Sequence, residues 1–144
     1  MIVKSLKDII GTDREVDDGK WVSRRLLLKD ARMGFSLHDT IIRAGVELPM
    51  HYQNHLEAVY CVGGKGKLVS RDTGEEWPIE EGVVYALDQH DRHTLISETE
   101  MRMVCVFNPP LTGRETHDAT GAYPLILDDG AVSAPSPGAA GRAD

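Results

Sequence analysis

Short stretches in which apolar and polar residues alternate recur along most of this chain. Met101, Met103, Cys105 and Phe107 share one parity, for example, and Arg102 has the other. Side chains two positions apart lie on the same face of a strand, so this alternation predicts half-buried β-strands. The chain shows no helical periodicity of useful length. The predicted strands are residues 25–28, 35–42, 58–62, 66–70, 75–79, 83–87, 93–96 and 102–107.

Turn-forming residues separate these strands. The run 71–74 (Arg-Asp-Thr-Gly) predicts a tight hairpin with Gly74 at positive φ, and the glycine-rich run 63–66 predicts a second turn. Residues 5–10 are a short helix or strand candidate, and the acidic run 12–19 is expected to form a turn. Many short strands at this spacing indicate an all-β barrel or jelly roll.

Composition limits the classes of protein to consider. The 144 residues fit one domain, which we place at 1–128, followed by a small-residue, Pro- and Gly-containing tail at 129–144 that we expect to be disordered. The net charge of -7 argues against a nucleic-acid surface. No apolar run reaches the roughly 20 residues that span a bilayer, and the first residues lack signal-peptide features. Cys61 and Cys105 are expected to be buried free thiols, so we expect a cytoplasmic protein.

A carboxylate stands among apolar residues in the most distinctive stretch, 45–66. If residues 57–62 form a strand, Glu57 shares a face with Val59 and Cys61, where an unpaired charge is costly. Either a metal ion or a buried hydrogen-bond partner would remove that cost. A second stretch, 80–96, adds Tyr85 and His93, each of which can also be an ordinary core residue. Together the three offer two oxygen donors and one nitrogen donor, a set that suits Fe(II) and also zinc or manganese.

These two stretches resemble the two sequence motifs of cupins. The first motif aligns with Gly45, His51, Gln53, Glu57 and Gly64, and the second with Gly82, Asp88, His90 and His93. Gln53 stands where a second histidine ligand is usual, and Asp88 and His90 replace a proline and a glycine. The resemblance therefore implies a cupin-type β-barrel with a modified metal site and one or two short helices.

Four longer blocks, residues 21–45, 51–68, 85–95 and 106–125, resemble the ectoine synthases within the cupins. The resemblance extends to about residue 128. It implies a head-to-tail homodimer and an Fe(II)-dependent cyclocondensation in which N-γ-acetyl-2,4-diaminobutyrate loses water. The substrate would be this small molecule, and neither nucleic acid nor membrane would be a partner.

Site residues follow from the resemblance by position. Arg25 is a reasonable clamp for the substrate carboxylate, because guanidinium binds carboxylate in a bidentate manner. The loop at 111–123 can serve as a lid over the barrel, and which residue is the general acid and which the base stays open. The resemblance implies metal ligands Glu57, Tyr85 and His93, acid–base residues Tyr52, His55, Glu115 and His117, and substrate-pocket residues Trp21, Arg25, Thr40 and Phe107.

Two other classes fit parts of the pattern. A non-catalytic cupin that senses a small molecule would need a partner or DNA-binding segment, which this length does not accommodate. An iron oxygenase commonly uses two histidines and one carboxylate, whereas a tyrosine takes one of those places here. An oxygenase consumes oxygen with its substrate, and a cyclase works without it.

Overall fold

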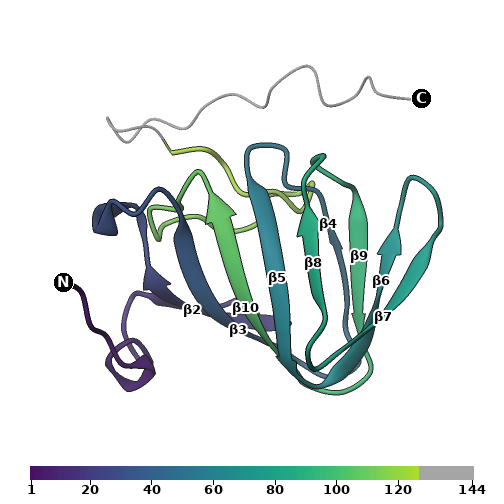
Figure 1. Ribbon diagram of the computed structural model, residues 1–144, viewed down its shortest axis with the longest axis horizontal. Helices are drawn as coiled ribbons and strands as arrows, with labels where there is room; N and C mark the ends of the chain where they lie inside the picture. The colour runs from purple at the N-terminus through teal and green to yellow at the C-terminus, as the bar shows by residue number, and fades with distance from the viewer. Residues whose placement is uncertain (127–144) are drawn as a thin grey trace.

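The computed structural model describes residues 1–126, which fold almost entirely into antiparallel β-structure (Figure 1). Two short 3-10 helices precede the first and third strands. The elements in chain order are η1 (Leu6–Asp8), β1 (Glu15–Asp17), β2 (Trp21–Leu27), η2 (Lys29–Ala31), β3 (Ser36–Ile42), β4 (Glu47–Met50), β5 (Leu56–Gly63), β6 (Lys65–Ser70), β7 (Glu76–Glu80), β8 (Val84–Leu87), β9 (His93–Ser97) and β10 (Met101–Asn108).

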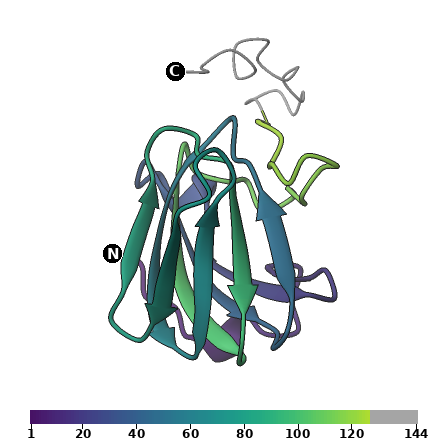
Figure 2. The same cartoon turned by 90° about the vertical axis from the view of Figure 1, so that its right-hand side faces the viewer.

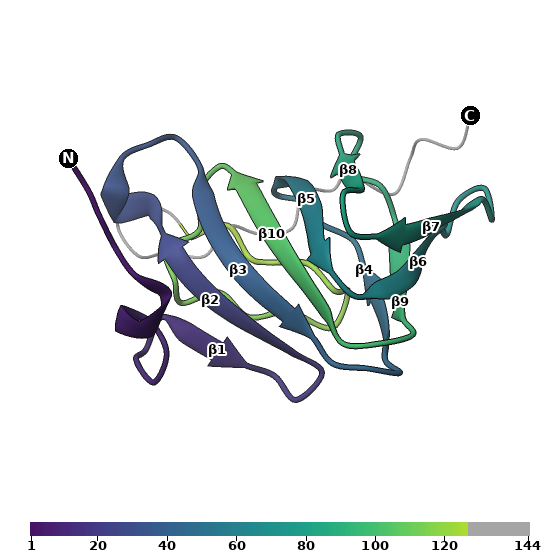
Figure 3. The same cartoon turned by 60° about the horizontal axis from the view of Figure 1, so that its bottom comes forward.

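Two antiparallel sheets make up the barrel. One has the strand order β1-β2-β3-β10-β5-β8 and the other β4-β9-β6-β7 (Figures 2 and 3). The chain after β10 runs across the upper end of the barrel in Figure 1. The predicted all-β barrel with one or two short helices is confirmed.

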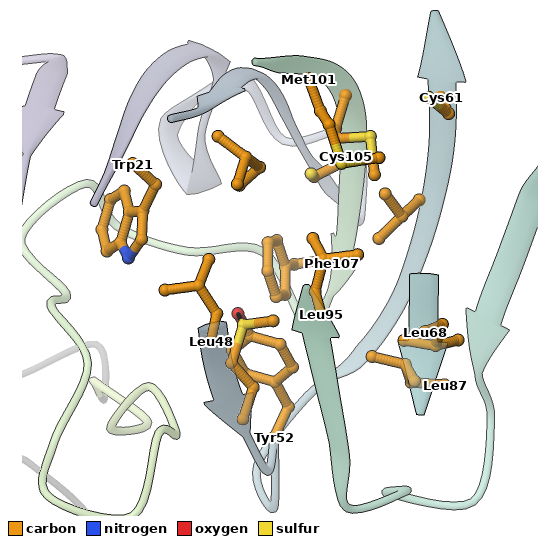
Figure 4. Packing of buried hydrophobic residues seen from close by; sticks show 14 of the residues in the cluster. Trp21, Leu48, Tyr52, Cys61, Leu68, Leu87, Leu95, Met101, Cys105 and Phe107 are labelled. Carbon is orange, nitrogen blue, oxygen red and sulfur yellow. Dashed lines mark hydrogen bonds between the residues drawn. The ribbon is translucent and has the colours of Figure 1, made fainter. Parts of the chain in front are cut away.

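The core lies between the sheets and follows the predicted alternation. On β10, Met101, Met103, Cys105 and Phe107 are buried and Arg102 is exposed. On β5 the buried positions are Glu57, Val59 and Cys61, so the predicted inward face of this strand is also correct. Cys61 and Cys105 are free, buried thiols, as expected. Leu48, Leu68 and Leu95 of the smaller sheet complete the cluster (Figure 4).

Two strands were not predicted from the sequence. Glu15–Asp17, interpreted as part of an acidic turn, forms the edge strand β1, and its register with β2 begins at Glu15 opposite Arg24. None of its three residues is fully buried, so no apolar alternation marks this strand in the sequence. Glu47–Met50 forms β4 despite Pro49, because β4 is also an edge strand, where a missing N–H is tolerated.

The prediction of a turn at residues 63–66 is wrong. β5 ends at Gly63 and β6 begins at Lys65, so only Gly64 separates two strands that belong to different sheets. Gly64 has φ +86, and a Cβ there would lie 2.1 Å from the Glu100 carbonyl oxygen, so only glycine fits. The hairpin at 71–74 is as predicted, with Gly74 at φ +77.

The expected tail at 129–144 lies outside the described residues. Within residues 1–126, no helix is long and apolar enough to cross a membrane.

Candidate active site

A cavity of about 40 Å³ lies between the sheets, and its wall is largely aromatic and apolar. β2 and β3 contribute Trp21 and Thr40, and β10 contributes Phe107. Figure 4 shows Phe107 close to Tyr52, Leu48 and Leu95, with Trp21 at the side of the cluster farther from Leu68. The lining residues are Trp21, Ser23, His38, Thr40, Ile42, Leu48, Met50, Tyr52, Glu57, Val59, Tyr85, Leu95, Met103, Cys105, Phe107, His117 and Tyr123.

Residues 111–123, which we call the covering segment, close this cavity. The segment contains no strand or helix, in agreement with the predicted loop. Tyr123 stacks on Tyr52 with ring centroids 5.3 Å apart, and His117 lies 4.5 Å from Tyr123. Gly121 accepts a hydrogen bond from the His51 amide at 3.2 Å, which ties the segment to the end of β4.

Tyr52 and His117 form the polar contact of the cavity wall. The Tyr52 hydroxyl lies 2.9 Å from Nε2 of His117 and also 3.2 Å from the sulfur of Met50. Burial raises the pKa of Tyr52 well above 10 and lowers the pKa of His117 to about 4. At neutral pH the phenol is therefore protonated and the imidazole neutral, so the two groups meet across this contact as a neutral hydrogen-bonded pair.

Arg25 and Glu115 hold the covering segment and do not line the cavity. Arg25 is 0% exposed, and its guanidinium donates to the carbonyl oxygens of Gly113 at 2.9 Å and Glu115 at 2.7 Å. The Glu115 carboxylate accepts from the Thr112 amide and hydroxyl, each at 2.8 Å, and from the Gly113 amide at 2.9 Å. These bonds fold the beginning of the segment against β2.

Two of the predicted metal ligands lie on neighbouring strands. Val59 is opposite Tyr85 in the pairing of β5 with β8, so Glu57 and Tyr85 are diagonal neighbours on the inward face, and both line the cavity. Burial raises the pKa of Glu57 to about 8 and the pKa of Tyr85 well above 10. Two acidic groups are thus held protonated in an apolar site, which a bound cation would reverse.

The third predicted ligand, His93, comes from the other sheet. It lies on β9, is buried, and its Nδ1 is 2.9 Å from the Asp91 carbonyl oxygen, so Nδ1 carries the proton and Nε2 has the free lone pair. That Nε2 is buried without a hydrogen-bond partner among residues 1–126. Tyr85 and His93 both line a second cavity of about 400 Å³, which also contacts Trp77 of β7.

The donor set fits a metal ion. Tyr85 lines the central cavity together with Glu57 and the second cavity together with His93. A divalent cation would stabilise the partnerless imidazole nitrogen of His93 and the carboxyl group and phenol that burial keeps neutral. In the described part of the chain, no three His, Cys, Asp or Glu side chains form a cluster able to hold a metal. The set of Glu57, Tyr85 and His93 contains only two such residues, with a phenol as the third donor.

The remaining predicted residues divide between the wall and the layer behind it. Trp21, Thr40 and Phe107 line the cavity. His55 is buried behind the wall, with its ring edge-on to Phe107 at 6.0 Å, and its Nδ1 has no partner within residues 1–126. Burial lowers the pKa of His55 to about 4.

Three polar residues of the wall, Ser23, His38 and Tyr123, were not singled out from the sequence. Ser23 and His38 share a strand face with Arg25 and Thr40, respectively, so parity along β2 and β3 was the signal that could have found them. Tyr123 lies within the block 106–125, but it belongs to a loop, where no alternation of apolar and polar residues marks it. All three line the cavity.

The two packed antiparallel sheets with a cavity between them make this fold the predicted cupin-type β-barrel. An RmlC-like cupin protein from Desulfovibrio desulfuricans has the same fold, with a TM-score of 0.54 at 23% identity over 66% of this chain and 88% of that one.

The family within this class follows from closer relatives. A sequence profile described as ectoine synthase matches residues 1–127. The L-ectoine synthase of Halalkalibacterium halodurans is 57% identical over 129 residues, which is 90% of this chain and all of that protein. The crystal structure of ectoine synthase from P. lautus has a TM-score of 0.80 at 53% identity, covering 91% of this chain and 96% of that one. The chain therefore belongs to the ectoine synthase family of hydro-lyases.

Proposed function

We propose that the central cavity closes N-γ-acetyl-2,4-diaminobutyrate into the cyclic amidine ectoine with loss of water. The observation that carries this proposal is the hydrogen-bonded pair of Tyr52 and His117 in the wall of a small aromatic cavity, in a chain of the ectoine synthase family. An aromatic wall suits a compact ring, and the pair supplies groups that move protons.

The reaction needs a group that carries protons, and it leaves the net charge of the substrate unchanged. The α-ammonium nitrogen forms a bond to the acetyl carbonyl carbon, and the carbonyl oxygen leaves as water. Two hydrogens leave the ammonium nitrogen and end on that oxygen, while the positive charge remains on the amidinium product. A group that accepts a proton near nitrogen and returns it near oxygen therefore completes the cycle.

Tyr52 and His117 are arranged for that transfer. His117 is neutral at pH 7 because burial lowers its pKa to about 4, so Nε2 accepts a proton from the α-ammonium. Tyr52 is protonated at neutral pH, so its hydroxyl gives a proton to the departing oxygen and takes one back from Nε2 of His117. The 2.9 Å contact links the two groups into one relay.

We further propose that Glu57, Tyr85 and His93 hold Fe(II), with zinc or manganese suited to the same donors. The partnerless Nε2 of His93 and the raised pKa of Glu57 support this assignment. When bound, the metal would supply a Lewis acid that polarises the acetyl carbonyl, which is otherwise a poor electrophile.

The covering segment controls admission of the substrate and excludes water. A cavity of about 40 Å³ holds only a few water molecules, so the segment must move before the substrate enters. Once it closes, Trp21 and Phe107 exclude water, which matters because the reverse reaction is a hydrolysis. The Thr40 hydroxyl contacts the substrate. Arg25 and Glu115 act through the position of the segment, as their hydrogen bonds to it indicate.

An anaerobic assay of Fe(II)-loaded protein with N-γ-acetyl-2,4-diaminobutyrate tests the proposal. Ectoine is quantified by chromatography and bound iron by elemental analysis. Glu57→Gln is expected to lose both product and iron, while Glu47→Gln, which changes an exposed glutamate, keeps both. Oxygen-dependent turnover would favour an oxygenase. Ligand binding without any product from iron-loaded wild type would favour a sensor.

We also propose that the protein is a cytoplasmic homodimer, which family membership supports. Light scattering coupled to size-exclusion chromatography measures the mass directly. A mass of one 15.9 kDa chain at micromolar concentration would contradict the dimer.

A further inference from the structure

A row of buried polar groups leads from the covering segment to the cavity wall. The Leu111 amide donates to Oγ of Ser36 at 3.1 Å, and that oxygen lies 3.1 Å from Nε2 of His38. Nδ1 of His38 lies 3.1 Å from Oγ of Ser23. The three side chains are almost fully buried, and His38 and Ser23 line the cavity. The relay of Tyr52 and His117 uses none of them.

The direction of each hydrogen bond in this row can be worked out. Oγ of Ser36 accepts from the Leu111 amide, and its own buried proton points to the adjacent acceptor, Nε2 of His38. His38 is neutral, because burial and then the charge of Arg25 lower its pKa to about 3. A neutral imidazole that accepts at Nε2 carries its proton at Nδ1. Nδ1 of His38 therefore donates to Ser23.

The hydroxyl proton of Ser23 is left facing the cavity. Oγ of Ser23 accepts from Nδ1 of His38 and, in a longer contact of 3.4 Å, from Nε of Arg25. Among the residues described, these are the hydrogen-bond partners of that oxygen, and both are donors. Ser23 is also directly opposite Thr40 in the pairing of β2 with β3, so two hydroxyls stand side by side on the wall.

We propose that Ser23 donates a hydrogen bond to the substrate carboxylate and that His38 is the positioning residue that fixes the direction of this donor. Two donors on Oγ, one of them the Arg25 guanidinium, polarise the hydroxyl and favour an anionic acceptor. The ammonium group of the substrate is itself a donor and does not suit this position. The inference rests on the proposed function, because it assigns a contact to that substrate.

The test compares two molecules that differ only in the carboxylate. N-γ-acetyl-2,4-diaminobutyrate is the substrate, and N-acetyl-1,3-diaminopropane keeps the amine and the amide. The analogue is measured as a substrate or, where turnover is slow, as a competitive inhibitor. For Ser23→Ala, kcat/KM for the natural substrate is expected to fall about 10- to 100-fold. The kcat/KM or inhibition constant of the analogue is expected to stay within about twofold of its wild-type value. With both molecules as substrates, the ratio of the two kcat/KM values does not depend on how much enzyme is folded and metal-loaded.

Two further variants separate positioning from structure. Ser36→Ala removes the hydroxyl that donates to Nε2 of His38. The ratio of kcat/KM for the natural substrate to kcat/KM for the analogue is therefore expected to fall, but by a smaller factor than in Ser23→Ala. Ser5→Ala, which changes a serine at the start of η1 that lines neither cavity, should leave the ratio at the wild-type value. An equal loss for both molecules in Ser23→Ala would overturn the carboxylate contact. Wild type that forms no ectoine would instead overturn the proposed function, and this inference with it.

Discussion

Replacing Arg25 with methionine is expected to release the covering segment without unfolding the barrel. Methionine roughly keeps the volume of the side chain but removes the donors to the Gly113 and Glu115 carbonyl oxygens. It also removes a fully buried charge, which was costly to desolvate, so global stability need not fall. The substitution is therefore expected to destabilise the closed position of residues 111–123, so that this segment opens more often.

The size of the effect follows from the two bonds. A hydrogen bond to a charged group contributes about 1.5 kcal/mol or more, so two contribute about 3 kcal/mol to the closed state. Because about 1.4 kcal/mol is a tenfold change in an equilibrium constant, opening should become roughly 100-fold more favourable. Hydrogen–deuterium exchange measures this at amides that the segment holds in hydrogen bonds, such as Thr112, Gly113 and Ala122.

The neighbouring arginine supplies a matched control. Arg24 is on the opposite face of β2 and pairs with Asp39, so Arg24→Met should leave exchange in the covering segment unchanged. A clamp acting on the substrate itself predicts another result for Arg25→Met, a raised KM with normal exchange in residues 111–123. That result would refute a role for Arg25 in holding the segment closed.

Three further substitutions test the fold and its pH dependence. Gly64→Ala places a Cβ 2.1 Å from the Glu100 carbonyl oxygen at φ +86, so chemical unfolding should show a loss of about 3–5 kcal/mol, against about 1–2 kcal/mol for Gly74→Ala, which has positive φ but open space. The pKa of His38 is lowered by burial from 6.5 to about 3, so its neutral form stabilises the fold above pH 6.5, and this contribution is lost as pH falls from 6.5 toward 3. Between pH 8 and pH 5 wild type should lose about 2 kcal/mol more than His38→Gln in urea unfolding, and equal losses would contradict the assignment. Asp39→Asn breaks up a buried carboxylate with two arginine partners and should cost about 2–4 kcal/mol by the same measurement, whereas a change below about 1 kcal/mol would indicate that the cluster is solvent-screened.

The sequence predicts this fold where strand geometry is local. Alternation along β5 and β10 identified the buried faces correctly, including Glu57 on the inside, because a period of two requires no knowledge of the partner strand. The same rule missed β4, whose Pro49 is acceptable only because the strand is at an edge of its sheet. The glycine-rich run around Gly64 was interpreted as a turn, although β5 passes directly into β6 there. Glycine is typical both of turns and of such close backbone approaches, so the sequence does not distinguish the two.

For the site, the sequence by itself determined the residue types and the strand face that each occupies, and resemblance to a family supplied their grouping. Only the tertiary structure decided which faces meet. His93 comes from the opposite sheet and lines a cavity together with Tyr85, and Arg25 meets two carbonyl oxygens that lie 88 and 90 positions further along the chain. Such contacts depend on how two sheets pack and how a loop without periodicity crosses them, so no pattern within one strand encodes them. The direction of the Ser23 hydroxyl likewise depends on donors from β3 and the covering segment, which become neighbours only in the folded barrel.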